Sequence, residues 1–126
     1  KQICSILRTR PELHVVAEAG DGLEAVQKAQ ELQPDLILLD IGLPSLNGLE
    51  AMSRIRQIVP GAKILFLTQN SDKDIVRIAL RTGAQGYILK SDAQSELLPA
   101  VERILGDGTF VGSGIKGRNP GETEDG

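Results

Sequence analysis

The sequence predicts an α/β protein built around a doubly wound parallel sheet. Short, continuous apolar runs alternate along the chain with segments whose apolar residues recur at helical spacing. Continuous apolar runs are typical of strands that helices cover on both faces, whereas the helical spacing is typical of amphipathic helices. Because strands alternate with helices throughout, we expect parallel strands joined by right-handed crossovers. The length of 126 residues suits one such domain.

The first half of the chain contains two predicted helices and two predicted strands. Helical spacing of apolar residues predicts helices over residues 1–9 and 23–32, and Pro34 stops the second of them. The β-branched segment 14–19 (HVVAEA) predicts a short strand, which a Gly-Asp-Gly turn ends. Residues 35–40 (DLILLD) predict a buried strand that ends in a carboxylate.

The second half repeats the same alternation. Helices are predicted over residues 49–59, 71–80 and 95–105 from the spacing of their apolar residues. Two further strands are predicted over residues 63–67 (KILFL) and 86–89 (GYIL). Strand and helix therefore follow one another to the end of the patterned part of the chain.

The chain divides into a domain of residues 1–105 and a glycine-rich linker or disordered tail of residues 106–126. Seven glycines fall among the last 21 residues, where apolar content drops. The one cysteine, Cys4, cannot form an internal disulfide, and no apolar leader opens the chain, so we expect a cytoplasmic protein. The apolar runs are too short to cross a bilayer.

The composition argues against direct nucleic-acid binding by this chain. The formal net charge is −3, and the chain holds one Tyr, two Phe and no Trp. A nucleic-acid reader needs a basic surface for the phosphates, and many single-strand binders also need aromatic platforms for the bases. We therefore expect contact with DNA only through another domain.

The carboxyl ends of the strands are the place to look for a functional site, because open parallel α/β sheets bind their ligands there. The predicted strands end at Ala19, Asp40, Thr68 and Lys90. A carboxylate, a hydroxyl and an ammonium together suit phosphoryl transfer, with Asp40 as the nucleophile and Lys90 as a point charge for the phosphoryl group. Taken singly, each residue could also be an ordinary cap, strand end or solvated side chain.

Three motif-bearing segments of the sequence resemble the receiver domain of two-component response regulators. The resemblance runs from residue 1 to about residue 105 and implies a flavodoxin-like (βα)5 fold. The segments that carry the resemblance are Leu39-Asp40-Ile41-Gly42-Leu43-Pro44 with Gly48, Leu67-Thr68, and Gly83-Ala84 with Gly86-Tyr87-Ile88-Leu89-Lys90. Residues 18–25 and 87–91 resemble the NarL/LuxR-type branch of that family.

The resemblance implies that Asp40 accepts a phosphoryl group from a sensor histidine kinase, with Mg²⁺ as the cofactor. The ion would take the Asp40 carboxylate and the backbone carbonyl of Gly42. Thr68 would be the switch hydroxyl, Tyr87 the ring that follows it inward, and Lys90 the cation on the phosphoryl oxygens. Such a domain is a phosphoprotein that can catalyse its own dephosphorylation, and it is not a dedicated enzyme.

Two departures from the family pattern stand out. Receivers open with a strand that ends in two adjacent acidic metal ligands, and no such segment precedes the first predicted helix here. In the family's strand order, 2-1-3-4-5, that first strand lies in the middle of the sheet. We therefore expect on the order of 10–15 further residues before Lys1. The second departure is Gln69, where the family usually carries a small residue, and it predicts slow dephosphorylation.

Three functional hypotheses remain open from the sequence. The first is a phosphoacceptor that regulates transcription through a DNA-binding output domain outside this chain. The second is a degenerate, phosphorylation-independent interaction module, which the missing acidic pair favours. The third is a small-molecule-binding flavodoxin-like domain, against which stands the lack of a phosphate-cradling loop. A homodimer is a further expectation, because an unpaired strand edge is a template for pairing.

Overall fold

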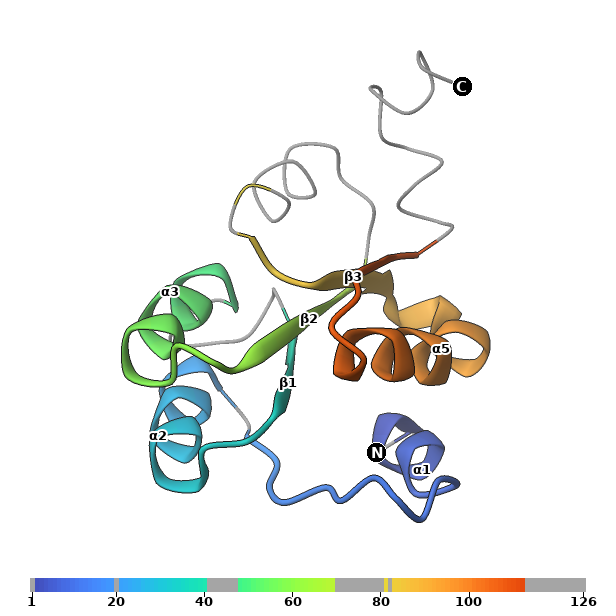
Figure 1. Cartoon of the computed structure of the whole chain (residues 1–126), viewed down its shortest axis with the longest axis horizontal. Helices are drawn as coiled ribbons and strands as arrows, with labels where there is room; N and C mark the ends of the chain where they lie inside the picture. Colours follow the sequence, from blue (N-terminus) through green and yellow to red (C-terminus); the bar gives the residue numbers. More distant parts are fainter. Residues whose placement is uncertain (1, 20, 41–47, 70–80, 82, 113–126) are drawn as a thin grey trace.

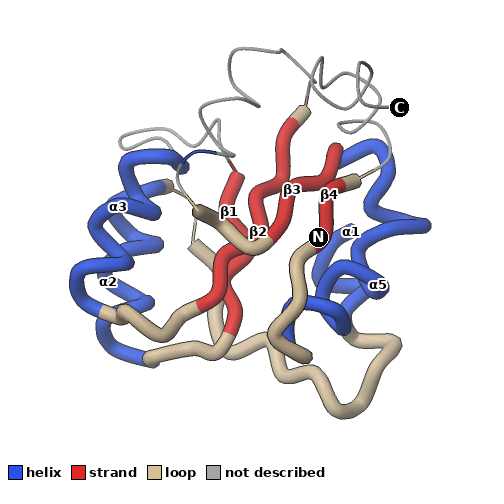
Figure 2. Tube along the Cα trace, turned by 45° about the horizontal axis from the view of Figure 1, so that its top comes forward, coloured by secondary structure: helices blue, strands red, loops and turns tan. Residues whose placement is uncertain are grey.

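A four-stranded, fully parallel sheet forms the centre of the molecule, as the computed structural model shows (Figures 1 and 2). The structure describes residues 2–19, 21–40, 48–69, 81 and 83–112. The strands lie in the order β1-β2-β3-β4, so each neighbours the next along the chain. Their bounds are β1 Leu36–Asp40, β2 Lys63–Thr68, β3 Gly86–Leu89 and β4 Phe110–Val111.

Helices cover both faces of this sheet, which confirms the doubly wound α/β prediction. Figure 1 shows α2 and α3 packed together on one side of the strands and α1 and α5 on the other. The bounds are α1 Gln2–Leu7, α2 Gly22–Leu32, α3 Gly48–Ile58, the short 3₁₀ helix η1 Lys90–Asp92, and α5 Ala93–Leu105. The helix predicted over residues 71–80 lies outside the described residues.

The buried side chains form two clusters, one on each face of the sheet. Alternate residues of β2 enter opposite clusters, Ile64 and Phe66 on the α2/α3 side and Leu65 and Leu67 on the α5 side. This alternation explains why the KILFL run is continuously apolar, since both faces of its strand are covered. Within the described part of the chain, no helix is long and apolar enough to span a membrane.

The segment 14–19 is not a strand, so that prediction was wrong. Its backbone forms neither helix nor strand and pairs with no neighbour among the described residues, and Val16 remains 61% exposed. A strand is stabilised by its ladder to a neighbour, so β-branched residues alone do not make one. Among the described residues no strand precedes this segment, which agrees with the departure from the family pattern noted in the sequence.

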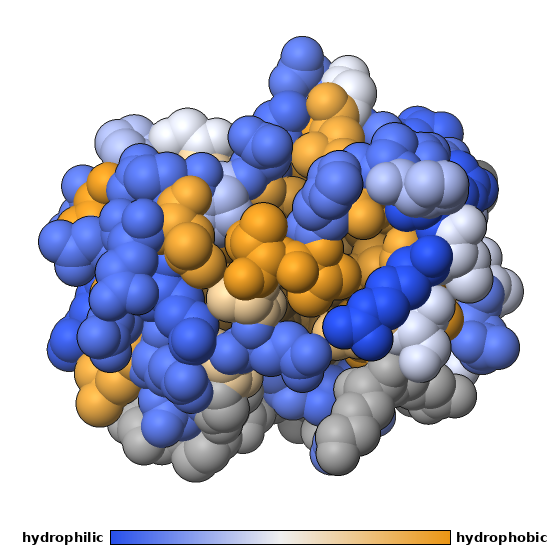
Figure 3. Space-filling model, turned by 90° about the horizontal axis from the view of Figure 1, so that it is seen from below, coloured by the Kyte–Doolittle hydropathy of each residue, from blue (hydrophilic) through white to orange (hydrophobic). Residues whose placement is uncertain are grey.

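Among the described residues β1 pairs only with β2, and part of its apolar surface is exposed. Leu36, Ile37 and Leu38 are only half-buried, although β2 of the same sheet is buried along most of its length. Figure 3 shows hydrophobic surface gathered near the middle of the molecule's lower face. An uncovered edge of this kind offers unpaired backbone groups beside apolar side chains.

Gln85 ties together three elements at the amino ends of the strands. Its side-chain oxygen accepts hydrogen bonds from the Ile64 amide at 2.9 Å and from Arg56 of α3 at 3.2 Å. Its backbone carbonyl accepts from the Phe110 amide at 3.0 Å. One side chain and its backbone thus set the register of β2, β3 and β4 at this end.

Cys4 is a buried thiol on α1, with 8% of the residue exposed. A hydrogen bond with the Glu18 carboxylate is the main cause that raises the pKa of this thiol, and burial adds to it. Both effects favour the protonated form, because a carboxylate acceptor and a desolvated site each disfavour a thiolate. Cys4 therefore behaves as a core residue, as a lone cysteine in an apolar segment usually does.

We predict that Gly86→Ala destabilises the fold. A Cβ at this position would lie 2.7 Å from both Ile104 Cδ1 and Leu65 Cδ1, which are fully buried. Overpacking of this kind costs about 1–3 kcal/mol, measurable as a lower urea midpoint with an unchanged slope. Gly61→Ala is the matched control, because nothing lies within 4 Å of its Cβ position. Equal midpoints for the two variants would contradict the packing described here.

We predict that Cys4 is alkylated slowly by iodoacetamide near neutral pH, because the thiolate is the nucleophile and its pKa is raised. Glu18→Gln removes the carboxylate and should move the pH profile of alkylation to lower pH, since the charged form is then less disfavoured. Glu12→Gln serves as the control, as Glu12 is exposed and pairs with Arg10. Identical pH profiles for both variants would rule out the Glu18 contact as the cause.

Candidate functional site

The candidate site lies at the carboxyl ends of β1, β2 and β3, which meet at the same end of the sheet. Asp40 is the last residue of β1, Thr68 is the last residue of β2, and Lys90 directly follows β3. The register places Asp40 beside Leu67 and Thr68 beside Leu89, so the three chain ends are level with one another. Parallel pairing therefore assembles residues that are far apart in the sequence.

An ion pair joins two of the predicted site residues. The Lys90 ammonium donates a hydrogen bond to Asp40 Oδ2, and their side chains are 33% and 29% exposed. Lys90 is also the first residue of η1, so its backbone turns away at once while its side chain reaches across β2 to β1. The pair compensates the Asp40 charge and keeps a cation within reach of any group attached to that carboxylate.

Thr68 brings a buried hydroxyl to the same edge. It is 5% exposed and is the polar residue within the buried core of the described chain. Its position at the end of the central strand β2 places it between the strands that carry Asp40 and Lys90. The next residue, Gln69, is exposed to solvent beside this edge.

Tyr87 points into the core on the α2/α3 side of the sheet. Only 4% of the residue is exposed, and its ring stacks on Phe66 with centroids 5.8 Å apart and planes 25° apart. Its hydroxyl donates to the Ala84 carbonyl at 3.4 Å. The Tyr87 ring thus lies inside the core and not at the surface.

The contact between Phe66 and the Tyr87 ring was not predicted from the sequence. Phe66 is fully buried, and the register places it directly beside Tyr87 on the neighbouring strand. Side chains alternate between the two faces of the KILFLT strand, so Phe66 and Thr68 lie on the same face. This alternation is the sequence feature that could have pointed to Phe66. The register that brings the two rings together could not be derived from spacing alone.

The described residues do not form a magnesium site by themselves. Mg²⁺ prefers six oxygen ligands in octahedral geometry, often with one or two carboxylates and several waters. Among the residues that the structure describes, no three His, Cys, Asp or Glu side chains are grouped to hold a metal. Gly42, the predicted carbonyl ligand, lies outside those residues. Asp40 is thus one carboxylate, paired with Lys90, where a metal would need further oxygens.

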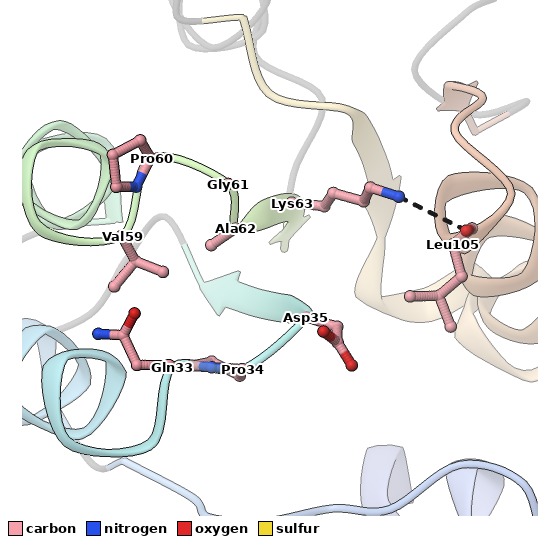
Figure 4. Close-up of a pocket in the computed structure, with 9 residues that line it drawn as sticks. All are labelled: Gln33, Pro34, Asp35, Val59, Pro60, Gly61, Ala62, Lys63 and Leu105. Atoms are coloured by element: carbon pink, nitrogen blue, oxygen red, sulfur yellow. Dashed lines mark hydrogen bonds between the residues drawn. The ribbon is translucent and has the colours of Figure 1, made fainter.

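A hollow lies beside the amino ends of β1 and β2, at the end of the sheet opposite the candidate site (Figure 4). It has a volume of about 550 Å³ and contains none of the predicted site residues. Lys63 at its rim donates to the Leu105 carbonyl at 3.5 Å and to the Asp107 carboxylate at 2.7 Å, which lowers the pKa of Asp107. Its lining residues are Gln33, Pro34, Asp35, Val59, Pro60, Gly61, Ala62, Lys63 and Leu105.

Comparison with known proteins shows the family. Residues 1–102 match the family model of the response regulator receiver domain. The transcriptional regulatory protein LnrK of Bacillus subtilis (strain 168) is 40% identical over 109 residues, 86% of this chain and 50% of that protein. The oxygen regulatory protein NreC of Staphylococcus aureus (strain JH9) is 41% identical over 107 residues, 84% of this chain and 49% of that protein. The chain belongs to the response regulator receiver domains.

The branch within that family follows from a solved structure. A two-component response regulator of the LuxR family from Aurantimonas sp. SI85-9A1 matches with a TM-score of 0.86 and 34% identity, over 96% of this chain and 84% of that one. With the relatives above, this match identifies a NarL/LuxR-type receiver, as the sequence analysis expected. The chain spans about half the length of the curated relatives it matches.

Proposed function

We propose that Asp40 accepts a phosphoryl group from a phosphohistidine of a sensor kinase. The observation that carries this proposal is the ion pair between Asp40 and Lys90 at the carboxyl edge of a receiver-type sheet. Family membership alone would hold for a degenerate receiver as well, whereas this pair supplies the carboxylate and the cation that phosphoryl transfer uses.

The phosphoryl transfer uses the side chains at the carboxyl ends of these strands. An Asp40 carboxylate oxygen attacks phosphorus, the new P–O bond forms, and the P–N bond to the histidine ring breaks with its electron pair leaving on nitrogen. The product is an acyl phosphate. Lys90 exchanges its contact with the carboxylate for the phosphoryl oxygens, where negative charge is concentrated. Hydrolysis by water then returns the Asp40 carboxylate and inorganic phosphate.

Thr68 and Tyr87 are the residues we assign to the switch. The Thr68 hydroxyl ends the strand between Asp40 and Lys90, so a phosphoryl group on Asp40 would give it a new hydrogen-bond acceptor. Movement of Thr68 toward that acceptor leaves room behind it, which the inward ring of Tyr87 occupies. The buried, stacked position of Tyr87 supports this assignment.

The protein as a whole is proposed to be a cytoplasmic transcription regulator. Relatives such as the transcriptional regulatory protein DegU of Brevibacillus brevis, 39% identical over 106 residues, support an output of this kind. Those residues make up 45% of that relative, so the proposed DNA-binding output domain lies outside the matched region. A sensor histidine kinase and a second copy of the receiver are the proposed protein partners.

Magnesium is typical of receiver domains, and we propose Asp40 and the Gly42 carbonyl as two of its ligands. Among the described residues no group of three His, Cys, Asp or Glu side chains surrounds Asp40, and none of the steps above depends on the ion.

We predict that Asp40→Asn abolishes labelling of the full-length natural protein by acetyl phosphate with Mg²⁺. The amide is close in shape to the carboxylate but is not a nucleophile toward phosphorus. Asp35→Asn is the matched control, because Asp35 is exposed at the other end of the same strand, and it should be labelled normally. Intact mass spectrometry measures the added phosphoryl group.

Two outcomes would contradict this assignment. Labelling that persists in Asp40→Asn would place the acceptor elsewhere. Absence of labelling in the natural protein, with a far-ultraviolet circular dichroism spectrum of a folded domain, would favour the interaction module.

We predict that Gln69→Ala shortens the half-life of the acyl phosphate several-fold. The exposed Gln69 side chain follows Thr68 at the edge where water must approach the phosphoryl group, so its removal opens that approach. The decay of phosphorylated protein after removal of acetyl phosphate gives the half-life. Gln57→Ala, on an exposed position of α3, is the control. A half-life equal to that of the natural protein would show that Gln69 does not shield the site.

A further inference from the structure

A row of four side chains crosses the whole sheet in register. Leu39 lies beside Phe66, Phe66 beside Tyr87, and Tyr87 beside Val111. Leu39, Phe66 and Tyr87 belong to the buried cluster on the α2/α3 side, and Val111 packs against it. The row begins next to Asp40 and ends on β4, so apolar contacts connect the candidate site to the outermost strand.

β4 was not predicted, because residues 106–126 read as a glycine-rich linker or tail. It is held on β3 by few contacts. The Phe110 amide donates to the Gln85 carbonyl at 3.0 Å, and the Gly112 amide donates to the Tyr87 carbonyl at 2.7 Å. Phe110 packs on the α5 side of the sheet while Val111 packs on the other side. A strand of two residues is a minimal ladder, and segments held by few hydrogen bonds belong to the least stable parts of a fold.

Gly112 fits the docked strand because it lacks a side chain. A Cβ there would lie 2.8 Å from Glu96 Oε1, 3.2 Å from the backbone Cα of Ile88 and 3.2 Å from Ile88 Cγ2. The residue is buried, and the parallel direction of β4 brings it to the end of the sheet that carries Asp40 and Lys90. The last described residue after β4 therefore lies at the same end of the sheet as the candidate site.

We propose that β4 is a coupling strand, whose docking on β3 is strengthened when Asp40 is phosphorylated. This inference rests on the proposed phosphoacceptor function. Val111 lies beside Tyr87 in register and packs against the buried cluster that contains the Tyr87 ring, and the Tyr87 carbonyl accepts a hydrogen bond from the Gly112 amide. A phosphoryl group that stabilises the inward ring through Thr68 thus also stabilises β4.

The coupling is reciprocal, because two sites that bias one equilibrium must affect each other equally. Docking of β4 covers one side of Tyr87 and so favours the inward ring. The docking of Phe110, Val111 and Gly112 then depends on the state of Asp40 without any contact between β4 and Asp40.

Amide hydrogen exchange on the full-length natural protein tests this proposal. With acetyl phosphate and Mg²⁺, exchange of the Phe110 and Gly112 amides should slow by about tenfold, a coupling of ordinary size. Asp40→Asn under the same conditions should show no such slowing. The Phe66 amide, in the centre of the sheet, should be unaffected in both.

Two variants separate docking from phosphorylation. Gly112→Ala should speed exchange of the Phe110 amide in the unphosphorylated protein, because the new Cβ meets the Ile88 backbone. Gly61→Ala, with open space at its Cβ, is the matched control. Val111→Thr keeps the shape of the side chain, weakens its apolar contact with Tyr87, and should reduce the slowing caused by phosphorylation.

The outcomes distinguish the two proposals. Phosphorylation of Asp40 without a change in Phe110 and Gly112 exchange overturns the coupling and leaves the phosphoacceptor function intact. No phosphorylation of the natural protein overturns both. Slowing of exchange that is equal in the natural protein and in Val111→Thr shows that the side-chain row does not carry the coupling, which overturns it as well.

Discussion

Parallel pairing of β1, β2 and β3 is the constraint on which the rest of this structure depends. It brings the carboxyl ends of three strands to the same end of the sheet. Asp40 and Lys90 therefore form an ion pair although 50 positions separate them. The same pairing buries Thr68 between them and sets the ring of Tyr87 against Phe66. Without the common strand direction, these residues would have no reason to meet.

The two edges of the sheet differ in a way that bears on function. At one edge, β1 pairs only with β2 among the described residues and leaves three apolar side chains half-buried. At the other, β4 pairs with β3 through two residues. Among the described residues, no strand therefore lies beside β1, where the family resemblance places a first strand, whereas β4 covers the outer side of β3.

Most of the fold could be predicted because its signals are local. The strand predicted over residues 35–40 and the helix predicted over residues 23–32 each match the observed element within one residue. Segment 14–19 failed because a strand needs a neighbour, which propensity does not supply. β4 was missed for the converse reason, since Phe110 and Val111 are too short a signal in a glycine-rich segment and pair only because β3 presents a free edge.

For the candidate site, the sequence alone determined the residue types and the fact that each ends a strand, because both are properties of contiguous residues. It therefore predicted Asp40, Thr68 and Lys90 as candidates, whereas Tyr87 came only from the family resemblance. Only the tertiary structure decided that Lys90 contacts Asp40, that Phe66 seats Tyr87, and that Val111 extends the same row. Those relations depend on strand register, which long-range hydrogen bonding across the sheet sets and no local pattern encodes.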